Sequence, residues 1–215
     1  MVNQEIIQYV ESLLPKKEET IVAMEQYARE HGVPIMDALS IETMLHILKL
    51  IQPMRILEIG TAIGYSAIRM AKALPNAKIV TIERDEERYK QARMYTEQTN
   101  TKKQITLLFG DALDINDEVK KYAPFDVLFI DAAKGQYRRF FELYEPMLSE
   151  KGIIITDNVL FKGLVATNEP IEQKRIRQLM KKIRAYNEWL VAHPSYETII
   201  IPIGDGMAIS RKRGE

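Results

Sequence analysis

The distribution of apolar residues along the chain changes character near residue 53. Before this point, apolar side chains recur at helical spacing in three segments, the first of which ends at Pro15 and the second at Gly32. After it, short apolar runs alternate with amphipathic segments. The pattern predicts one domain over 1–215, with an N-terminal helical cap over 1–52 and a core over 53–215. The three helices of the cap are expected at 3–15, 17–32 and 36–51.

The apolar runs beyond residue 53 are short and rich in β-branched residues, which is typical of strands covered on both faces. Segments with helical spacing separate them. Strands and helices that alternate in this way predict an open parallel sheet with helices on both sides. The strands are expected at 55–60, 78–83, 104–109, 125–131 and 152–157, and the helices between them at 64–74, 85–99 and 137–149.

The C-terminal part departs from this alternation. After a long helix expected around 170–191, the apolar runs 196–203 and 206–212 meet at a Gly-Asp-Gly turn, which predicts a β-hairpin. A mostly parallel seven-stranded sheet that ends in an antiparallel hairpin is unlike the usual dinucleotide-binding arrangement. It resembles the Rossmann-like α/β fold of Class I S-adenosylmethionine-dependent methyltransferases.

Composition narrows the classes of function. With 215 residues and 46% hydrophobic side chains, the chain can form one substantial core. Its formal net charge is zero, so binding of a polyanion would require a local basic patch. The absence of Cys excludes disulfides and thiolate metal sites, and three scattered His argue against zinc. Without a basic leader or a long apolar run, we expect a cytoplasmic protein with no membrane partner.

Acidic residues at the ends of the expected strands are the first candidates for ligand binding, because ligands of such sheets bind at the carboxyl ends of the strands. Glu58 and Gly60 end the first strand, and the G-x-x-x-G spacing to Gly64 matches neither a dinucleotide fingerprint nor a phosphate loop. Gly60 could also serve only helix–strand packing. Glu83 ends the second strand, where a carboxylate can accept both ribose hydroxyls, and Asp111 ends the third, where it could face an adenine edge. Acidic strand ends without a loop suited to bind a diphosphate favour S-adenosylmethionine over NAD as the ligand of this site.

Two further apolar runs also end on acids. Asp131 lies in FIDAAKGQY and is followed by Lys134, and Asp157 lies in IIITDNV and is followed by Asn158. A carboxylate and an amide after one strand can be an ordinary Asx turn. Two such strand ends in one sheet could instead form a metal site.

The order of these motifs resembles the metal-dependent O-methyltransferase family that includes catechol and caffeoyl-CoA O-methyltransferases. The similarity runs from IMDALS through LEIGTAIGYSA, TIERD, GDA and IDAAKGQY to TDNV, and so covers most of the chain. It implies an S-adenosylmethionine-dependent enzyme that uses Mg²⁺ or another divalent cation. The donor-binding residues that it implies, together with Asp111 from the strand-end argument, are Met36, Glu58, Gly60, Ser66, Glu83, Asp111, Ala112 and Asp131.

The resemblance also implies that Asp131, Asp157 and Asn158 hold the metal, with Asp131 and Lys134 as catalytic residues. The fourth and fifth strands are expected to be neighbours about 5 Å apart, so their acids would share one sheet edge. With the Asn158 carbonyl they offer three hard oxygen ligands suited to Mg²⁺, which lowers the pKa of a substrate hydroxyl. Lys134 would then accept or relay the proton, or hold the oxyanion.

The acceptor stays open between three alternatives. The sequence as a whole is similar to those of compact bacterial members of the family, which methylate 5-hydroxyuridine at the tRNA wobble position to 5-methoxyuridine. Catechol-specific members carry a tryptophan where this chain has Ala133, and the substrate-holding loop of plant members is missing, but a small catechol-like or caffeoyl-CoA-like acceptor remains an alternative. A non-catalytic nucleoside-binding module is another. We expect a homodimer.

A basic segment near the C-terminus could serve a tRNA substrate. Cationic residues of 174–184 fall on one half of the expected helix and apolar residues on the other. This face either contacts phosphates or is simply solvated. Its cations are Lys174, Arg175, Arg177, Lys181, Lys182 and Arg184.

Overall fold

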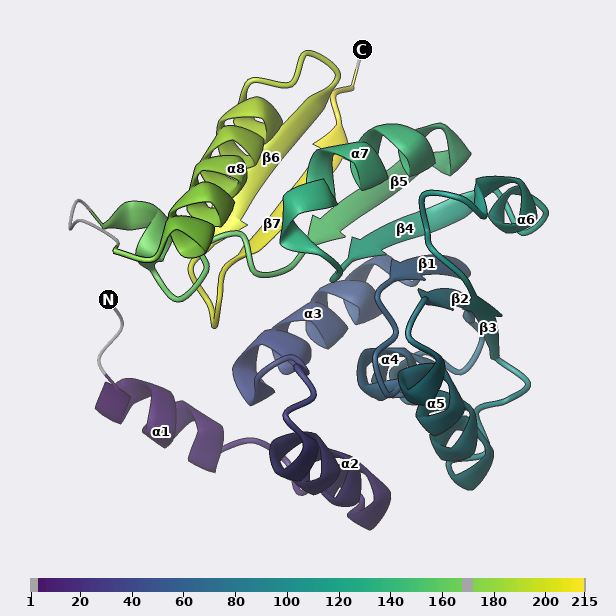
Figure 1. The fold of residues 1–215 in the computed structure, drawn as a ribbon. Coiled ribbons are helices and arrows are strands. Elements are labelled where there is room, and N and C mark those ends of the chain that lie inside the picture. Colours follow the sequence, from purple (N-terminus) through teal and green to yellow (C-terminus); the bar gives the residue numbers. More distant parts are fainter. Residues whose placement is uncertain (1–3, 168–171, 215) are drawn as a thin grey trace.

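A seven-stranded sheet forms the centre of the computed structural model, which describes residues 4–167 and 172–214 (Figure 1). The strand order is β3-β2-β1-β4-β5-β7-β6, in which β7 pairs antiparallel with both β5 and β6 and the other pairs are parallel. This confirms the predicted Class I methyltransferase fold. The strands are β1 (Arg55–Ile59), β2 (Lys78–Glu83), β3 (Ile105–Phe109), β4 (Phe125–Ile130), β5 (Leu148–Thr156), β6 (Tyr196–Ile201) and β7 (Met207–Lys212).

Helices cover both faces of the sheet (Figure 1). One core contains apolar side chains of α2, α3, α4 and α5, and the other contains those of α6, α7 and α8. None of the described helices is long and apolar enough to cross a membrane. The helices are α1 (Gln4–Ser12), α2 (Glu19–His31), α3 (Ala38–Ile51), α4 (Tyr65–Ala73), α5 (Glu86–Gln98), α6 (Asn116–Lys120), α7 (Tyr137–Tyr144) and α8 (Lys174–Val191), with short 3₁₀ turns η1 (Lys134–Gln136), η2 (Glu145–Met147) and η3 (Leu164–Ala166).

The predicted elements are found close to their expected bounds, with three differences. The helix expected over 137–149 was wrong at its end: α7 stops at Tyr144 because Pro146 cannot continue a helix, and β5 already begins at Leu148. The short helix α6 was not predicted. Of the helix expected around 170–191, the structure contains α8 from Lys174, and 170–171 lie outside the described residues.

The point between β1 and β4, where the strand order reverses, leaves little room for side chains. Gly60 has a φ of 104°, and a Cβ at this position would lie 2.0 Å from the carbonyl oxygen of Asp131. Only glycine allows the loops after β1 and β4 to approach so closely. Gly60 is therefore needed for packing. The close approach that it allows shapes the place where ligands of such sheets bind.

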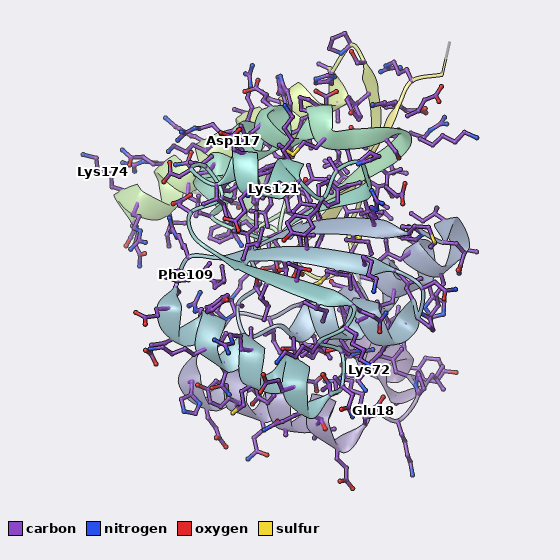
Figure 2. The ribbon with its side chains drawn as sticks, turned by 90° about the vertical axis from the view of Figure 1, so that its right-hand side faces the viewer. Glu18, Lys72, Phe109, Asp117, Lys121 and Lys174 are labelled. Atoms are coloured by element: carbon purple, nitrogen blue, oxygen red, sulfur yellow. The ribbon has the colours of Figure 1, made fainter. Side chains whose placement is uncertain are left out.

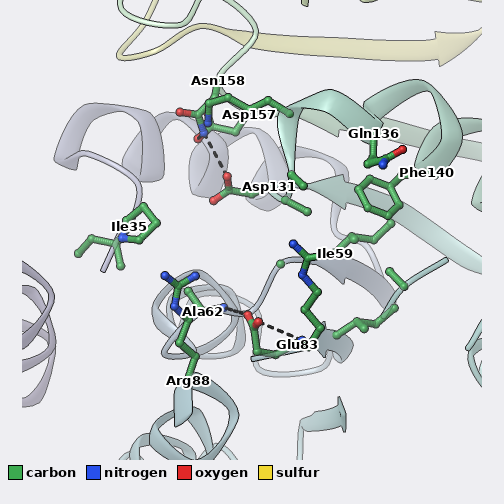
Figure 3. A pocket seen from close by; sticks show the side chains of 18 of the residues that line it. Ile35, Ile59, Ala62, Glu83, Arg88, Asp131, Gln136, Phe140, Asp157 and Asn158 are labelled. Atoms are coloured by element: carbon green, nitrogen blue, oxygen red, sulfur yellow. Dashed lines mark hydrogen bonds between the residues drawn. The ribbon is translucent and has the colours of Figure 1, made fainter. Parts of the chain in front are cut away.

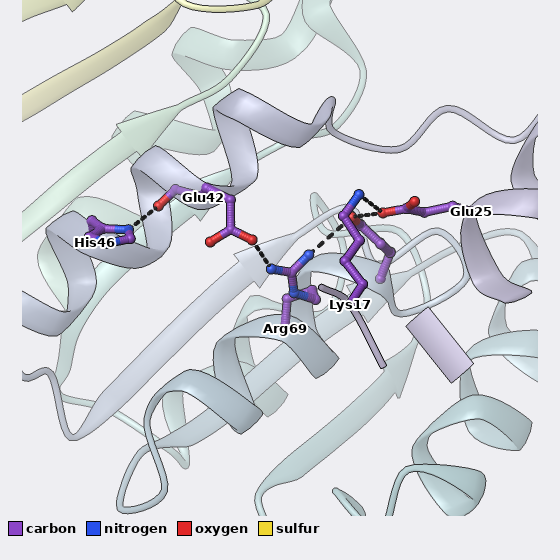
Figure 4. A network of polar contacts seen from close by, with 6 residues as sticks. Lys17, Glu25, Glu42, His46 and Arg69 are labelled. Atoms are coloured by element: carbon purple, nitrogen blue, oxygen red, sulfur yellow. Dashed lines mark hydrogen bonds and ion pairs between the residues drawn. The ribbon is translucent and has the colours of Figure 1, made fainter. Parts of the chain in front are cut away.

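A polar network ties α2 and α3 to α4 (Figure 4). The hydroxyl of Tyr65 donates to Glu25 over 2.6 Å, and Lys17 contacts the same carboxylate at 2.6 Å. Arg69 donates to the Tyr65 hydroxyl over 3.2 Å and forms an ion pair with Glu42. The N-terminal helices are thus attached to the sheet by polar contacts as well as by apolar packing.

Charged residues, which make up 28% of the chain, form ion pairs between elements on the outer surface. Glu18 and Lys72 form an ion pair of 2.7 Å that joins the start of α2 to α4 (Figure 2). Phe109, at the end of β3, is one of the apolar side chains exposed on this surface, at 52%, and lies beside the ring of Tyr89. Single exposed apolar side chains of this kind are normal and need no partner.

Candidate active site

A cavity of about 500 Å³ lies at the carboxyl ends of β1 to β5 (Figure 3). Each of the loops that follow these strands contributes to its wall, and so do the segment before α3 and the turn between β6 and β7. The predicted site residues that line it are Met36, Gly60, Glu83, Asp111, Ala112, Asp131, Lys134, Asp157 and Asn158.

Glu83 is held in a fixed orientation at the end of β2. Its carboxylate accepts hydrogen bonds from the backbone N–H groups of Ala62 at 2.7 Å, Asp85 at 2.9 Å and Arg84 at 3.0 Å (Figure 3). The side chain faces the cavity and is nearly buried. A carboxylate oriented in this way is ready to accept hydrogen bonds from a ligand without further ordering.

Glu58 and Ser66 lie behind the cavity wall rather than on it. Glu58 is fully buried and accepts hydrogen bonds from the hydroxyls of Ser66 and Thr81. Burial raises the pKa of Glu58 to about 7, against the lowering effect of those two hydrogen bonds. Neither predicted donor contact is among the residues that line the cavity, so any influence on a ligand would pass through their neighbours.

Asp111 reaches the cavity with its carboxylate already engaged. The N–H of Leu113 donates to it at 3.0 Å and the guanidinium of Arg84 at 3.1 Å. The hydrogen bond from Leu113, assisted by Arg84, lowers the pKa of Asp111. An adenine bound at this point would share the Asp111 carboxylate with Leu113 and Arg84.

Met36 and Ala112 supply apolar wall, each only 6% exposed. The carbonyl of Ala112 accepts a hydrogen bond of 2.6 Å from the hydroxyl of Tyr144, which fixes the loop after β3. Together with Gly60 they line part of a cavity that also carries carboxylates and Lys134. This composition is typical of a small-molecule site.

The acids that end β4 and β5 lie side by side, as expected. Ile130 and Thr156 are paired in the sheet, so the residues that follow them, Asp131 and Asp157, leave it together. The amide nitrogen of Asn158 donates to both carboxylates, at 3.1 Å to Asp131 and 2.8 Å to Asp157 (Figure 3). Burial raises the pKa of both acids, and for Asp157 the charge of Asp131 adds to the effect.

These residues fit a hard divalent cation. The Oδ1 atom of Asp157 is buried and has no hydrogen-bond partner among the described residues, which is costly unless a cation binds there. Turning the Asn158 amide would direct its oxygen to the same point as the two carboxylates, giving three oxygen ligands. The described residues contain no group of three or more His, Cys, Asp or Glu suited to a metal, so the set depends on this amide.

Lys134 begins the turn η1 and lines the cavity on the same side as the acids. Its Nζ atom lies 6.0 Å from the ring centroid of Phe161, which follows β5. Tyr137 does not line the site but donates a hydrogen bond of 2.8 Å to the backbone carbonyl of Asp157. Phe161 thus places an aromatic ring near Lys134 although Ala133 does not.

The basic helix α8 packs against the turn that carries Lys134. The side chain of Lys182 lies over Gly135, where its Nζ atom would be 3.6 Å from a Cβ. Arg184, in contrast, is half buried and donates to the carbonyls of Val165 at 2.7 Å and Thr167 at 2.6 Å. Arg184 is therefore not part of the solvated basic face on which sequence periodicity placed it.

Four charged lining residues were missed from the sequence: Asp37, Arg84, Arg88 and Asp205. Asp37 caps α3 by accepting from the N–H of Ser40 at 3.0 Å, and a cap followed by serine was the available signal. Asp205 belongs to the Gly-Asp-Gly turn, which was interpreted only as a turn. A Cβ at Gly204 would lie 2.0 Å from an oxygen of Asp37, so this turn docks directly on the start of α3.

Comparisons with known proteins identify the family of this chain. A family model described as O-methyltransferase matches residues 16–213. The catechol O-methyltransferase of Niastella koreensis is 31% identical over 94% of this chain and 94% of its own length. A Staphylococcus aureus structure, provisionally named as a caffeoyl-CoA O-methyltransferase, is 34% identical with a TM-score of 0.90, over 99% of this chain and 100% of its own. The O-methyltransferase TomG of Streptomyces achromogenes, solved in complex with SAM, is 27% identical with a TM-score of 0.84 over 100% of both chains.

Proposed function

This chain belongs to the O-methyltransferase family and is an S-adenosylmethionine-dependent enzyme, and from that premise we propose that it methylates 5-hydroxyuridine at the wobble position of tRNA. The product would be 5-methoxyuridine. The vicinal O4 and O5 of this base are chemically close to the two hydroxyls of a catechol. The observation that carries the choice of tRNA is the contact of the basic helix α8 with the turn that holds Lys134.

The chain's residues divide the chemistry between donor and acceptor. When bound, a divalent cation makes a neighbouring hydroxyl more acidic, and S-adenosylmethionine supplies the methyl group. Glu83 orients the donor, and the acids of β4 and β5 with Asn158 hold the cation. Lys134 holds the acceptor oxygen or takes its proton. The cavity wall then aligns the two reactants, which is the main requirement of the transfer.

A tRNA acceptor suits the distribution of charge. The net charge is zero, so attraction to a polyanion must come from a local group of cations. Lys181 and Lys182 are exposed on α8, and Lys182 lies over Gly135, next to Lys134 in the turn η1. Phosphate contacts away from the reacting base supply binding energy that positions the base for reaction.

The test measures methylation of hydroxyuridine-containing tRNA by wild type and by Lys181→Ala/Lys182→Ala. We expect the KM for tRNA to rise several-fold and the slope of log K against log salt to fall by about 2, roughly one per phosphate contact. Turnover of a small catechol should not change. Arg184 is left intact because its loss would disturb the loop that it holds. The matched control is Lys120→Ala/Lys121→Ala, an exposed pair that precedes β4 and so lies at the amino end of this strand, away from the cavity at its carboxyl end.

A double variant that behaves as wild type would mean that this face is only solvated. Wild-type protein that ignores the tRNA altogether would favour the second candidate, a small catechol-like acceptor. That candidate is supported by the ring of Phe161 near Lys134 and by the catechol O-methyltransferase relative. The family also argues against a non-catalytic nucleoside-binding module.

Dependence on a divalent cation is tested separately with Asp157→Ala. Methyl transfer should be lost because one of the ligands is removed, while donor affinity should survive because Asp157 lies on the acceptor side of the cavity. Activity is measured by mass analysis of the nucleosides and donor binding by calorimetry. Full activity of the wild type after exhaustive chelation would remove the metal from the proposal.

The expected homodimer and cytoplasmic location stay predictions. In α1, the apolar residues Ile6 and Tyr9 are more than half exposed, as is Leu13 directly after it, and no described residue of this helix is buried. A second copy of the chain is the partner that we expect to cover them. Light scattering across protein concentrations measures the assembly, and a monomer at all concentrations would refute it.

A further inference from the structure

The segment that follows the proposed metal ligands has an unusual backbone. Asn158, Phe161 and Lys162 all have positive φ values, of 64°, 46° and 55°, and Gly163 follows at 78°. A non-glycine residue in this region costs roughly 1–2 kcal/mol, so such a conformation persists only when its surroundings determine it. The contacts that hold this segment therefore decide the geometry of the acceptor side.

Hydrogen bonds fix the peptide planes on both sides of Asn158. The plane before it is held by Tyr137, whose hydroxyl donates to the carbonyl of Asp157 at 2.8 Å. The plane after it is held by the N–H of Val159, which donates to the carbonyl of Gly206 at 3.0 Å. With both planes fixed, the main chain of Asn158 has little freedom to turn.

Side chains of α8 hold the next carbonyls of the same segment. Asn187 donates from Nδ2 to the carbonyl of Val159 at 2.8 Å, and the Arg184 guanidinium bonds the carbonyls of Val165 and Thr167. The turn after β6 meets the intervening N–H groups: those of Leu160 and Phe161 donate to the carbonyl of Asp205. The segment is thus held between α8 and the hairpin.

Asn187 of α8 buries a polar side-chain atom whose desolvation costs free energy. It is 9% exposed, and its Oδ1 atom is buried without a hydrogen-bond partner among the described residues. An apolar residue of similar size would avoid this penalty, which is typically about 1–3 kcal/mol. The hydrogen bond to the Val159 carbonyl is the contact that the Asn187 amide makes instead.

We propose that Asn187 and Arg184 are positioning residues, which hold the backbone of 159–167 and thereby set Asn158 toward the acids and the Phe161 ring toward Lys134. Neither side chain touches a reactant. The inference rests on the proposed metal-dependent function, because the residues that are positioned are its proposed ligand Asn158 and the Phe161 ring beside Lys134. It assigns the inner face of α8 a role that is distinct from that of the exposed lysines.

The experiment compares Asn187→Leu and Arg184→Lys with Glu188→Ala, an exposed α8 control. Hydrogen exchange of 157–167 should accelerate in both test variants and stay unchanged in the control. Mn²⁺ affinity, measured by electron paramagnetic resonance, should fall roughly tenfold or more, the range for residues that orient metal ligands. Donor affinity should stay within about twofold, because the donor side of the cavity is untouched.

Arg184→Lys separates a positional from an electrostatic role. Lysine keeps the charge but cannot bond two carbonyls with a planar fork, so it should behave like Asn187→Leu rather than like wild type. If both variants match the control in exchange and in Mn²⁺ affinity, the inference is wrong. A wild type that binds no Mn²⁺ would overturn the metal site itself, whereas the exchange rates would still decide whether α8 holds the segment.

Discussion

Glu83 and Glu58 are both buried acids at the carboxyl ends of parallel strands, and their surroundings give them different roles. Glu83 faces the cavity and is oriented by backbone N–H groups that stay in place when a ligand binds. Glu58 is buried behind the cavity wall and accepts hydrogen bonds from two hydroxyl groups. The first is suited to binding, and the second affects mainly the stability of the folded state.

Replacement of Glu83 by alanine should weaken binding of S-adenosylmethionine by about 1.5–3 kcal/mol, the range for a hydrogen bond to a charged group. This corresponds to roughly a 10- to 150-fold rise in Kd. Calorimetry measures the affinity, and Glu86→Ala, an exposed acid in the first turn of α5, is the control. An unchanged Kd would remove Glu83 from the donor site.

Glu58 should make stability depend on pH. Burial raises its pKa from 4.5 to about 7, so the unfolded chain releases this proton at lower pH than the native protein does. The contribution of Glu58 to stability is therefore full below pH 4.5 and is lost as pH rises toward 7, by about 3 kcal/mol in all at 1.36 kcal/mol per pH unit. Urea unfolding at pH 5 and pH 8 should show wild type losing about 2 kcal/mol more than Glu58→Gln. Equal losses of stability in wild type and Glu58→Gln would contradict the assignment of this pH dependence to Glu58.

Several of the residues that the sequence identified have a place that depends only on the strands. Asp131 and Asp157 could be assigned because each directly follows an apolar run, and strand order alone brings them together. Arg184 could not be assigned correctly, since helical periodicity places it beside Lys181 but does not show that carbonyls of another loop bind it. Phe161 was missed for the same reason, because its position depends on backbone angles that its own side chain does not favour.

At the scale of elements, the attachment of the N-terminal helices to α4 combines apolar and polar contacts. Tyr65 is 2% exposed, and its hydroxyl links Glu25 of α2 to Arg69 of α4. Such a link between helices far apart in the sequence is invisible to periodicity, although the helices themselves were predicted well. The polar contacts hold α2 against α4 (Figure 4).

Tyr65→Phe should lower the free energy of unfolding by about 1–2 kcal/mol, because the hydrogen bond to the Glu25 carboxylate is lost while the ring still packs. Urea denaturation followed by circular dichroism provides the measurement. The control is Tyr9→Phe in α1, where the ring is 65% exposed and the change should be within experimental error. Equal stability of the two variants would show that apolar packing alone holds α2.

At the scale of the whole molecule, the proposed division into a cap over 1–52 and a core over 53–215 does not divide the apolar interior. Ile21, Met44 and Leu48 from the cap belong to the same cluster as Ile56 and the other strand residues of that face. Exposure of this surface on separation would be costly, at about 25 cal/mol per Å² of apolar area. We therefore propose that cap and core unfold together.

A single transition should be seen by calorimetry, with equal calorimetric and van't Hoff enthalpies. The same midpoint should be found by far-ultraviolet circular dichroism and by the fluorescence of the single Trp, which lies in α8. A first transition that leaves the fluorescence of Trp189 unchanged would show instead that the cap melts independently.

The docking of the Gly-Asp-Gly turn on Asp37 and on the loop after β5 has a consequence for how the enzyme is made. A ribosome produces the start of α3 long before it produces residues 204–206, yet both form the wall of one cavity. Until the hairpin emerges, β5 has an unpaired outer edge, and such edges invite pairing with other chains. The nascent protein cannot draw stability from its methyl donor during this interval, because ligands stabilise only the state that binds them. Translation speed and chaperone protection between the synthesis of β5 and that of the hairpin should therefore influence the yield of active enzyme more than the supply of cofactor does.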